Sequence, residues 1–348
     1  MSTASVGEAT DDYKVTTKNL VYTGEELEGV VSVEHLNGIT PDFTLVKDVD
    51  YTVTYDENIN VGIARATINF IGKFEKVTET KGKLTATFLI DRADNELKVE
   101  DKTVVLGGSV QPKTTNKAGA AVAYTYYSDA DCTTEIAVPT KVGTYYVKAT
   151  SIATTNYNQA ESNVAKVVVV PGKVKMLGTS RTASSVKLNW EKSTGATSYR
   201  VYYKAAGAKS YKVFKNTTAT SMNVTGLASA TTYTFAVKAY AKTAGYSTVY
   251  ATKQTTTAPA KVATPSVTAG SKKATVKFTK VARATGYQIY MAKGNGKYVK
   301  VKTTTSTSFT KTGLAKGATY KFKVRAYKTV GSNTYYGAFS SAKAVVVK

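Results

Sequence analysis

The sequence predicts an all-β protein of four tandem β-sandwich domains in an elongated rod, and three observations support this fold class. The chain is rich in Thr, Val and Tyr, with 25 Tyr in 348 residues, and these residue types suit a pleated, half-buried strand. Apolar residues alternate with other residues, as at Tyr145, Val147 and Ala149, which is the period of a strand. Turn clusters of Gly, Asn, Asp and Ser separate such runs at about 8–12 residues, the spacing of a sandwich.

The N-terminal half divides into a tail and two domains. Residues 1–12 are expected to be a cloning-derived or disordered tail, because MSTASVGEATDD lacks the charged and apolar regions of a signal peptide. Residues 13–91 contain LVYTGEEL, DYTVTYDENINVGIARATI and LTATFLI, and residues 92–171 contain AYTYYSDADCTTEI, PTKVGTYYVKAT and VAKVVVV. Both segments resemble the immunoglobulin-like repeats, often called MBG-type, of Gram-positive bacterial surface proteins. The resemblance implies two Ig-like sandwiches.

An internal repeat organises the C-terminal half into residues 172–257 and 258–348. Three residue pairs match at a distance of 88 residues and three more match at 87, namely Trp190 and Phe278, Tyr199 and Tyr287, Tyr202 and Tyr290, then Leu227 and Leu314, Tyr233 and Tyr320, Tyr240 and Tyr327. A unit of this length fits one sandwich per copy.

Both copies also share longer motifs. The first copy reads VKLNW, SYRVYYK and L-x5-Y-x-F-x-V-x-A, and the second reads ATVKF, GYQIYMAK and the same Leu-to-Ala pattern. These two segments resemble fibronectin type III domains, with Phe278 in place of the usual Trp. The resemblance implies a tyrosine corner at Tyr233 and Tyr320, whose hydroxyl groups bond back to the chain near the preceding Leu.

The joints between the four domains are short, at residues 91–94, 170–173 and 257–261. Joints of this length leave little freedom, unlike long Gly/Ser linkers. With about ten residues per strand at ~3.3 Å each, one sandwich is roughly 35 Å long. Four sandwiches end to end therefore predict a semi-rigid rod of roughly 140 Å.

Charge is distributed unevenly along the chain, whose formal net charge is +23. Residues 1–91 carry 8 basic and 15 acidic groups, and residues 92–172 carry 8 of each. Residues 173–348 carry 31 basic groups and one acidic group, Glu191. Lys as a solubilising surface residue explains scattered cations, but it does not explain the lack of acids over 176 residues. The asymmetry indicates a polyanionic partner or surface.

The composition excludes several kinds of site. The chain has one Cys, Cys132, and one His, His35, so an intrachain disulfide is impossible and a Cys/His zinc site lacks ligands. Carboxylates beside Cys132 are expected to raise the pKa of its thiol, which argues against a nucleophile. We interpret His35, in VEHLNG, as a solvated residue beside a turn. No run of 18 apolar residues is present, so no membrane-spanning helix is expected.

The stretch of residues 48–62 offers two candidate sites. Asp48, Asp50, Asp56 and Glu57 could pair for glycosidic chemistry, but a hairpin that faces water explains them, so we expect no catalytic residue and no cofactor. Asp56, Asn58 and Asn60 precede Gly62 and place oxygen ligands at alternate positions, as calcium loops do. The closing Glu of an EF-hand is missing, and Asn is also ordinary turn chemistry. We favour a turn over a metal site.

The strongest positive signal is a predicted binding face in the basic half. Strand alternation turns every second residue of Tyr199–Lys204 and of Tyr233–Tyr240, and their counterparts in the second copy, away from the core. The resulting face interleaves cations with tyrosines. Its members are Arg200, Tyr202, Lys204, Lys238, Tyr240, Tyr290, Lys321, Lys323, Arg325 and Tyr327. Tyr can stack on sugars or bases while Lys and Arg neutralise anions, or the same residues are cross-strand pairs that only stabilise the sheet.

These observations favour a non-catalytic segment of a bacterial cell-surface or secreted protein, acting as an adhesion or spacer module. Expected partners are anionic wall polymers, host glycans or host proteins, and we expect a monomer. Two alternatives stay open, a receptor for a host protein such as an immunoglobulin or matrix protein, and an accessory region of a large carbohydrate-active enzyme. Nucleic-acid binding is not expected, because no nucleic-acid motif accompanies the positive charge.

Overall fold

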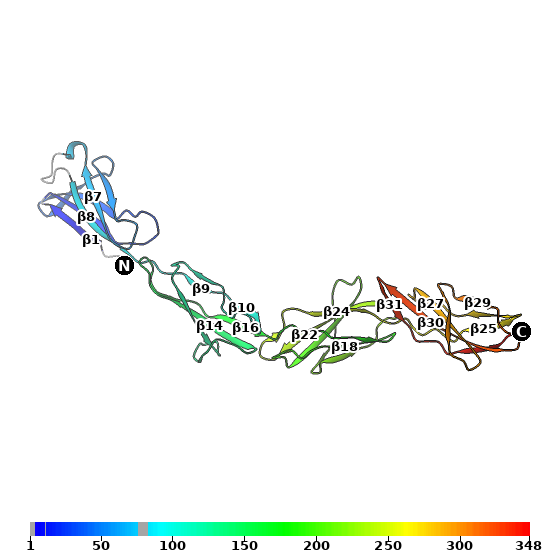
Figure 1. Cartoon of the computed structure of the whole chain (residues 1–348). Coiled ribbons are helices and arrows are strands. Elements are labelled where there is room, and N and C mark those ends of the chain that lie inside the picture. The colour runs from blue at the N-terminus through cyan, green and yellow to red at the C-terminus, as the bar shows by residue number, and fades with distance from the viewer. Residues whose placement is uncertain (1–3, 11, 76–82) are drawn as a thin grey trace. The chain divides into compact units, whose positions relative to one another are not determined.

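The computed structural model describes residues 4–10, 12–75 and 83–348 and confirms the prediction of tandem β-sandwiches (Figure 1). Nearly all of its regular elements are strands, joined by turns. The part of the chain that it describes contains no helix long and apolar enough to cross a membrane.

Residues 4–91 form two four-stranded sheets, ordered β1-β2-β4-β5 and β3-β8-β7-β6. The alternation of buried and exposed residues in β2 buries Tyr13, Val15 and Thr17 between the sheets. The buried Thr17 hydroxyl donates to Thr87 O of β8 at 2.9 Å, so it is not left unsatisfied. The elements are β1 (Ala4–Thr10), β2 (Tyr13–Lys18), β3 (Leu20–Val21), β4 (Val30–Asn37), β5 (Thr40–Thr44), β6 (Tyr51–Asp56), β7 (Gly62–Phe70), the 3-10 helix η1 (Gly72–Phe74) and β8 (Lys83–Asp91).

The described part of residues 1–12 is not disordered, because residues 4–10 form strand β1. Strand β1 pairs antiparallel with β2, from Ala4 opposite Lys18 to Thr10 opposite Tyr13. An extended segment next to a sheet edge satisfies its backbone groups by adding a strand, whatever its composition. Residues 1–3 and 11 lie outside the described residues.

Residues 92–171 form one sheet ordered β10-β16-β14-β12-β13, with β15 also paired to β14, and a two-stranded sheet of β11 and β9. Val147 and Ala149 of β14 are buried, as are Val167 and Val169 of the neighbouring strand β16. The strands are β9 (Leu97–Val99), β10 (Lys102–Val105), β11 (Thr114–Asn116), β12 (Val122–Tyr127), β13 (Glu135–Ile136), β14 (Gly143–Ser151), β15 (Ala160–Glu161) and β16 (Ala165–Val170).

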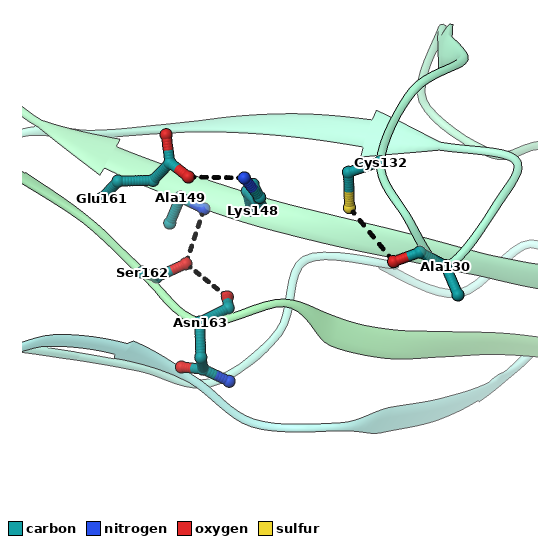
Figure 2. A network of polar contacts seen from close by, with 7 residues as sticks. All are labelled: Ala130, Cys132, Lys148, Ala149, Glu161, Ser162 and Asn163. Carbon is teal, nitrogen blue, oxygen red and sulfur yellow. Dashed lines mark hydrogen bonds and ion pairs between the residues drawn. The ribbon is translucent and has the colours of Figure 1, made fainter.

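Side-chain hydrogen bonds join the irregular parts of this segment to its strands. Figure 2 shows the Ser162 hydroxyl between two backbone groups: it accepts from Ala149 N at 2.9 Å and donates to Asn163 O at 2.7 Å. The Asn163 side chain accepts from Val99 N at 3.1 Å and donates to Val99 O at 3.0 Å. This side-chain amide therefore takes the place of a neighbouring strand for β9.

The last two segments have the same topology. In residues 172–257 the sheets are ordered β17-β18-β21 and β20-β19-β22-β23, with β24 on β22. In residues 258–348 they are ordered β25-β26-β29 and β28-β27-β30-β31, with β32 on β30. The strands are β17 (Ser180–Arg181), β18 (Val186–Asn189), β19 (Ser198–Ala205), β20 (Lys212–Thr217), β21 (Ser221–Val224), β22 (Thr232–Ala241), β23 (Gly245–Tyr246), β24 (Ala251–Thr256), β25 (Ser266–Gly270), β26 (Lys273–Lys277), β27 (Gly286–Lys293), β28 (Val299–Thr304), β29 (Ser308–Thr312), β30 (Thr319–Val330), β31 (Asn333–Tyr336) and β32 (Lys343–Val346).

Both segments contain the tyrosine corner expected from the sequence. The Tyr233 hydroxyl accepts Ala228 N–H at 3.0 Å, and the Tyr320 hydroxyl accepts Ala315 N–H at 3.2 Å. Each donor directly follows the matched Leu of its repeat. The two copies of the sequence repeat therefore share this hydrogen bond.

Candidate functional site

The predicted binding face lies on the outer surface of the larger sheet in each of the last two segments. In β30, Tyr320, Phe322 and Val324 are buried in the core, and the alternate residues lie on the other face of the sheet. In β22 the same alternation places Lys238 outward, opposite Arg200 of β19. We call these two surfaces the basic faces and define them by their cations. The cations are Arg200, Lys204 and Lys238 in residues 172–257, and Lys321, Lys323 and Arg325 in residues 258–348.

In residues 258–348, aromatic rings hold two of the three cations. The Lys323 ammonium lies 4.1 Å from the centroid of Tyr298 and 4.3 Å from that of Phe339. The Arg325 guanidinium carbon lies 4.1 Å from the Tyr336 centroid and 4.8 Å from that of Phe339. Both cations are half-buried, and such contacts stabilise a partly desolvated cation by about 0.5–2 kcal/mol each.

Neutral oxygen atoms accept hydrogen bonds from Arg325 and Lys321 on this face. Arg325 donates through Nε and Nη2 to Gln288 Oε1, at 3.0 and 2.8 Å, and Gln288 is its cross-strand partner in β27. Nη2 also donates to the Tyr290 hydroxyl at 3.2 Å. Lys321 Nζ donates to Asn295 Oδ1 at 2.8 Å. The three cations are therefore fixed in place without a carboxylate.

The basic face of residues 172–257 is built in the same way. Arg200 lies 4.7 Å from the Tyr246 centroid and donates through Nε to Asn216 Oδ1 at 2.8 Å. Lys204 lies over Tyr211 at 5.0 Å, and Lys238 lies over Tyr250 at 4.5 Å. The two tyrosines that hold these lysines stack on each other with centroids 5.2 Å apart.

Tyr202 was expected on the exposed face, but the structure places it in a different role. It is only 9% exposed, because Tyr250 packs edge-on against its ring at 5.2 Å. Burial is the main cause that raises the pKa of Tyr202, Tyr250 raises it further, and Arg200 opposes the shift. Burial likewise raises the pKa of Tyr211, with Tyr250 as the second cause. Tyr202 therefore supports the face from below and is not available to stack on a ligand.

Tyr240 and Tyr327 form the end of each basic face. Each lies opposite a second tyrosine in the next strand, Tyr246 for the former and Tyr336 for the latter, with centroids 4.7 and 6.4 Å apart. Tyr327 also covers Gly286 of β27, where an added Cβ would lie 2.6 Å from the tyrosine hydroxyl. An aromatic ring over a strand glycine replaces the packing that a side chain would supply.

Sequence reasoning missed the rings and amides that hold the cations, because most of them lie in turns and loops between the strands. A signal was present in the internal repeat. Tyr211 and Tyr298 are 87 residues apart, and Tyr246 and Tyr336 are 90 apart. The missed residues are Tyr211, Asn216, Tyr246, Tyr250, Gln288, Asn295, Tyr298, Tyr336 and Phe339.

The calcium candidate has the hydrogen bonds of a turn. Asp56 Oδ1 accepts Glu57 N–H at 3.0 Å, Asn58 Nδ2 donates to Leu27 O at 3.1 Å, and Asn60 Oδ1 accepts from Asn156 Nδ2 at 3.0 Å. Glu57 has a φ of 55°, as in a tight turn. These contacts support the turn interpretation, and calcium binding by this loop stays a prediction.

His35 is not the solvated turn residue that the sequence suggested. It lies in β4, opposite Tyr13 of β2 and Phe43 of β5. Its ring stacks on Phe43 at 4.8 Å and meets the edge of Tyr13 at 5.3 Å, while Nδ1 lies 3.3 Å from Asp42 Oδ2. The strand register places the His35 ring against Tyr13 and Phe43. The local sequence does not reveal this register.

Cys132 lies at a φ of 54° in the loop after β12, and its Sγ is 3.8 Å from Ala130 O (Figure 2). Burial is the first cause that raises the pKa of this thiol, the carboxylates of Asp129, Asp131 and Glu161 raise it further, and Lys148 lowers it. The direction agrees with the expectation of an unreactive thiol. Asp129 closes the loop by accepting Thr133 N and Thr134 N, each at 2.9 Å.

A comparison with protein families decides the nature of the last two segments. Residues 170–253 and 258–340 match the family model described as Fibronectin type III domain. These two segments are fibronectin type III domains. The family match confirms this part of the sequence-based resemblance. The basic faces therefore lie on the larger sheet of each fibronectin type III sandwich, which contains β22 or β30.

Two curated relatives are larger proteins, and this chain spans only about a fifth to a quarter of their length. The chain is 29% identical to Exoglucanase B of Cellulomonas fimi over 252 residues, which is 66% of this chain and 20% of that protein. It is 34% identical to Chitinase A1 of Niallia circulans over 181 residues, 47% of this chain and 24% of that protein. Among solved structures, a two-domain fibronectin type III segment of chicken tenascin covers 51% of this chain and 99% of its own, at 18% identity and a TM-score of 0.35.

Proposed function

We propose that this chain is a non-catalytic accessory region of an extracellular bacterial protein, which presents sandwich surfaces to a polysaccharide. The observation that carries the proposal is the similarity to Exoglucanase B over 66% of the chain. That share is larger than the two matched fibronectin type III segments together, so the likeness includes more than the common fold of those domains. Because the chain spans a fifth to a quarter of the two named enzymes, catalysis is assigned to domains of another kind.

The basic faces support a contact role. A sandwich whose interior is filled by side chains binds through its sheet faces and loops, and six half-buried cations lie on two such faces. Anionic wall polymers and host glycans fit this charge. Cell-surface attachment, a Gram-positive source, MBG-type repeats in residues 13–171 and host contact are parts of the proposal that rest on the sequence alone.

Cosedimentation of the chain tests the proposal. Purified protein is mixed with insoluble cellulose, with chitin and with washed Gram-positive cell walls, and the bound fraction is measured at physiological salt. Retention on at least one of these supports an accessory role at a polysaccharide. No retention on any of them overturns it, and capture of one immunoglobulin or matrix protein from serum then favours a host-protein receptor.

A further inference from the structure

Each ring of the basic faces lies against a cation. Tyr298 and Phe339 lie against the Lys323 ammonium, and Tyr336 lies against Arg325. In the first fibronectin type III domain, Tyr211 and Tyr250 hold Lys204 and Lys238 in the same manner. A ring that stacks on a sugar or a base must offer a free face. In these rings one face is occupied by a cation, and the ring area that stays exposed is largest at Tyr336, which is 45% exposed.

The two domains repeat this arrangement with one cation at a matching position and the others displaced. Lys238 corresponds to Arg325 at an offset of 87 residues, whereas Arg200 corresponds to Gln288 and Lys204 to Ala292 at an offset of 88, and Lys323 corresponds to Ala236 at an offset of 87. The ring positions do match, in the pairs Tyr211 with Tyr298, Tyr250 with Phe339 and Tyr246 with Tyr336. The repeat therefore preserves the rings and one cation, while the other cations come from β19 in the first fibronectin type III domain and from β30 in the second.

Among the described residues, no cation of the basic faces forms an ion pair with an acidic side chain. Residues 259–348 contain no Asp or Glu, so neither lysine nor the arginine of the second face can form an ion pair with an acidic side chain there. In the first fibronectin type III domain the one acidic residue, Glu191, pairs with Lys175, which is not on the basic face. Half-burial of an unpaired charge is unfavourable, and an anionic ligand removes this cost while the rings have already fixed the cations in place.

We propose that the basic faces bind an acidic polysaccharide through its charged groups, with the aromatic rings acting as supports for the cations and not as stacking platforms. The inference rests on the proposed accessory role and names the ligand class. Alternate residues along a strand are about 6.6 Å apart, so Lys321, Lys323 and Arg325 form a row of charges that suits a linear polymer with repeated carboxylate or sulfate groups. Nucleic acid fits less well, because the ring faces that would stack on bases hold cations.

A charge-removal variant with a matched control tests the proposal on the full chain. The test variant carries Lys321→Gln, Lys323→Gln and Arg325→Gln on β30. The control carries Lys273→Gln, Lys277→Gln and Lys311→Gln on β26 and β29, in the other sheet of the same domain. Both variants lose three positive charges, so they have the same net charge. Binding is measured with polygalacturonate, dextran sulfate, neutral dextran and single-stranded poly(dT), over a series of NaCl concentrations.

We expect the test variant to bind the acidic polysaccharides about tenfold more weakly, as three lost surface charge contacts imply, and the control to change little. Polygalacturonate and dextran sulfate distinguish carboxylate from sulfate recognition, and neutral dextran should not bind. A charge-retaining variant with Lys321→Arg, Lys323→Arg and Arg325→Lys should keep most of the affinity. Should the test variant not fold, Arg200→Gln with Lys204→Gln and Lys238→Gln in the first domain replaces it.

Three outcomes overturn the proposal. Equal losses in the test and control variants mean that net charge alone attracts the polymer. Binding of neutral dextran that survives charge removal means that the rings or other surfaces recognise sugar, which leaves the accessory role intact. Tighter binding of poly(dT) than of either acidic polysaccharide at equal salt assigns the faces to nucleic acid. Conversely, loss of polygalacturonate binding in the test variant without retention on any insoluble polysaccharide supports the faces and contradicts the accessory role.

Discussion

Lys238 lies over the ring of Tyr250, with its ammonium 4.5 Å from the ring centroid, and Arg325 lies over Phe339 at 4.8 Å in the corresponding place of the next domain. In both cases the ring lies in the loop before the last strand of the domain, which is β24 or β32. The cation lies on the central strand of the larger sheet, which is β22 or β30. The ring contact stabilises the sheet and also fixes the position of the cation. Replacing the ring should therefore lower the stability of the domain and change the position of the cation.

The first prediction concerns Phe339, which contacts Lys323 and Arg325 and meets the Tyr290 ring edge-on at 4.9 Å. Phe339→Leu removes two cation–π contacts of about 0.5–1 kcal/mol each, so we expect it to lower the free energy of unfolding of its domain by about 1–2 kcal/mol. Urea denaturation followed by Tyr fluorescence measures this. Phe339→Tyr keeps the ring and should restore stability. An unchanged midpoint in the Leu variant would contradict the supporting role of the ring.

The second prediction concerns the tyrosine corners. Tyr320→Phe leaves the partly buried Ala315 N–H without its acceptor, and an unsatisfied buried donor costs about 1–3 kcal/mol. Tyr233→Phe should have the same effect in the first fibronectin type III domain through Ala228. Calorimetry of each variant measures the shift in Tm. Tyr327→Phe removes a hydroxyl from the outer face and serves as the control, with an expected change below about 0.5 kcal/mol.

Much of the fold is readable from the sequence because it depends on local alternation and on the repeat. Period-two patterns place Phe235 and Phe322 in the cores, and the repeat predicts both tyrosine corners. Register is not readable in this way, since it is set by pairing between distant strands. His35 shows the limit, because its partners Tyr13 and Phe43 are chosen by the register of β2, β4 and β5.

The candidate site was predictable as a face but not as a contact network. Alternation correctly turns Arg200, Lys238 and Arg325 away from the core, yet it cannot show that loop residues such as Tyr250 and Phe339 return over the sheet. Tyr202 was for this reason expected to be exposed. The elongated rod stays a prediction from the short joints.

The third prediction concerns Asn163, whose side chain pairs with both backbone groups of Val99. Asn163→Ala removes two hydrogen bonds and leaves the Val99 groups without these partners, so we expect a loss of about 1–3 kcal/mol in the free energy of unfolding. Hydrogen exchange at the Val99 amide should become faster. Asn163→Asp keeps the acceptor for Val99 N–H but loses the donor to Val99 O, and it should slow that amide again relative to Ala.

The last prediction concerns acid sensitivity of the loop after β12. Hydrogen bonds from Thr133 N, then from Thr134 N and the Thr133 hydroxyl, lower the pKa of Asp129 from 3.8 to about 2. A carboxylate whose pKa is lower in the folded state stabilises that state fully above its unfolded value, and the contribution is lost as the pH falls through the folded value. The loop should therefore keep its structure at pH 4 and loosen between about pH 3.8 and pH 2.

Carboxyl NMR shifts and hydrogen exchange at Thr133 and Thr134 measure this transition, and the Asp129 signal should titrate with a midpoint near 2. Asp129→Ala removes the acceptor, so the two threonine amides should exchange faster already at pH 4, and the further acid-induced change should disappear. A midpoint near 3.8 in the unaltered chain would show that the two backbone hydrogen bonds do not hold the carboxylate. Persistent protection of both amides in the Ala variant would show that the turn itself, with Cys132 at a φ of 54°, is enough to close the loop.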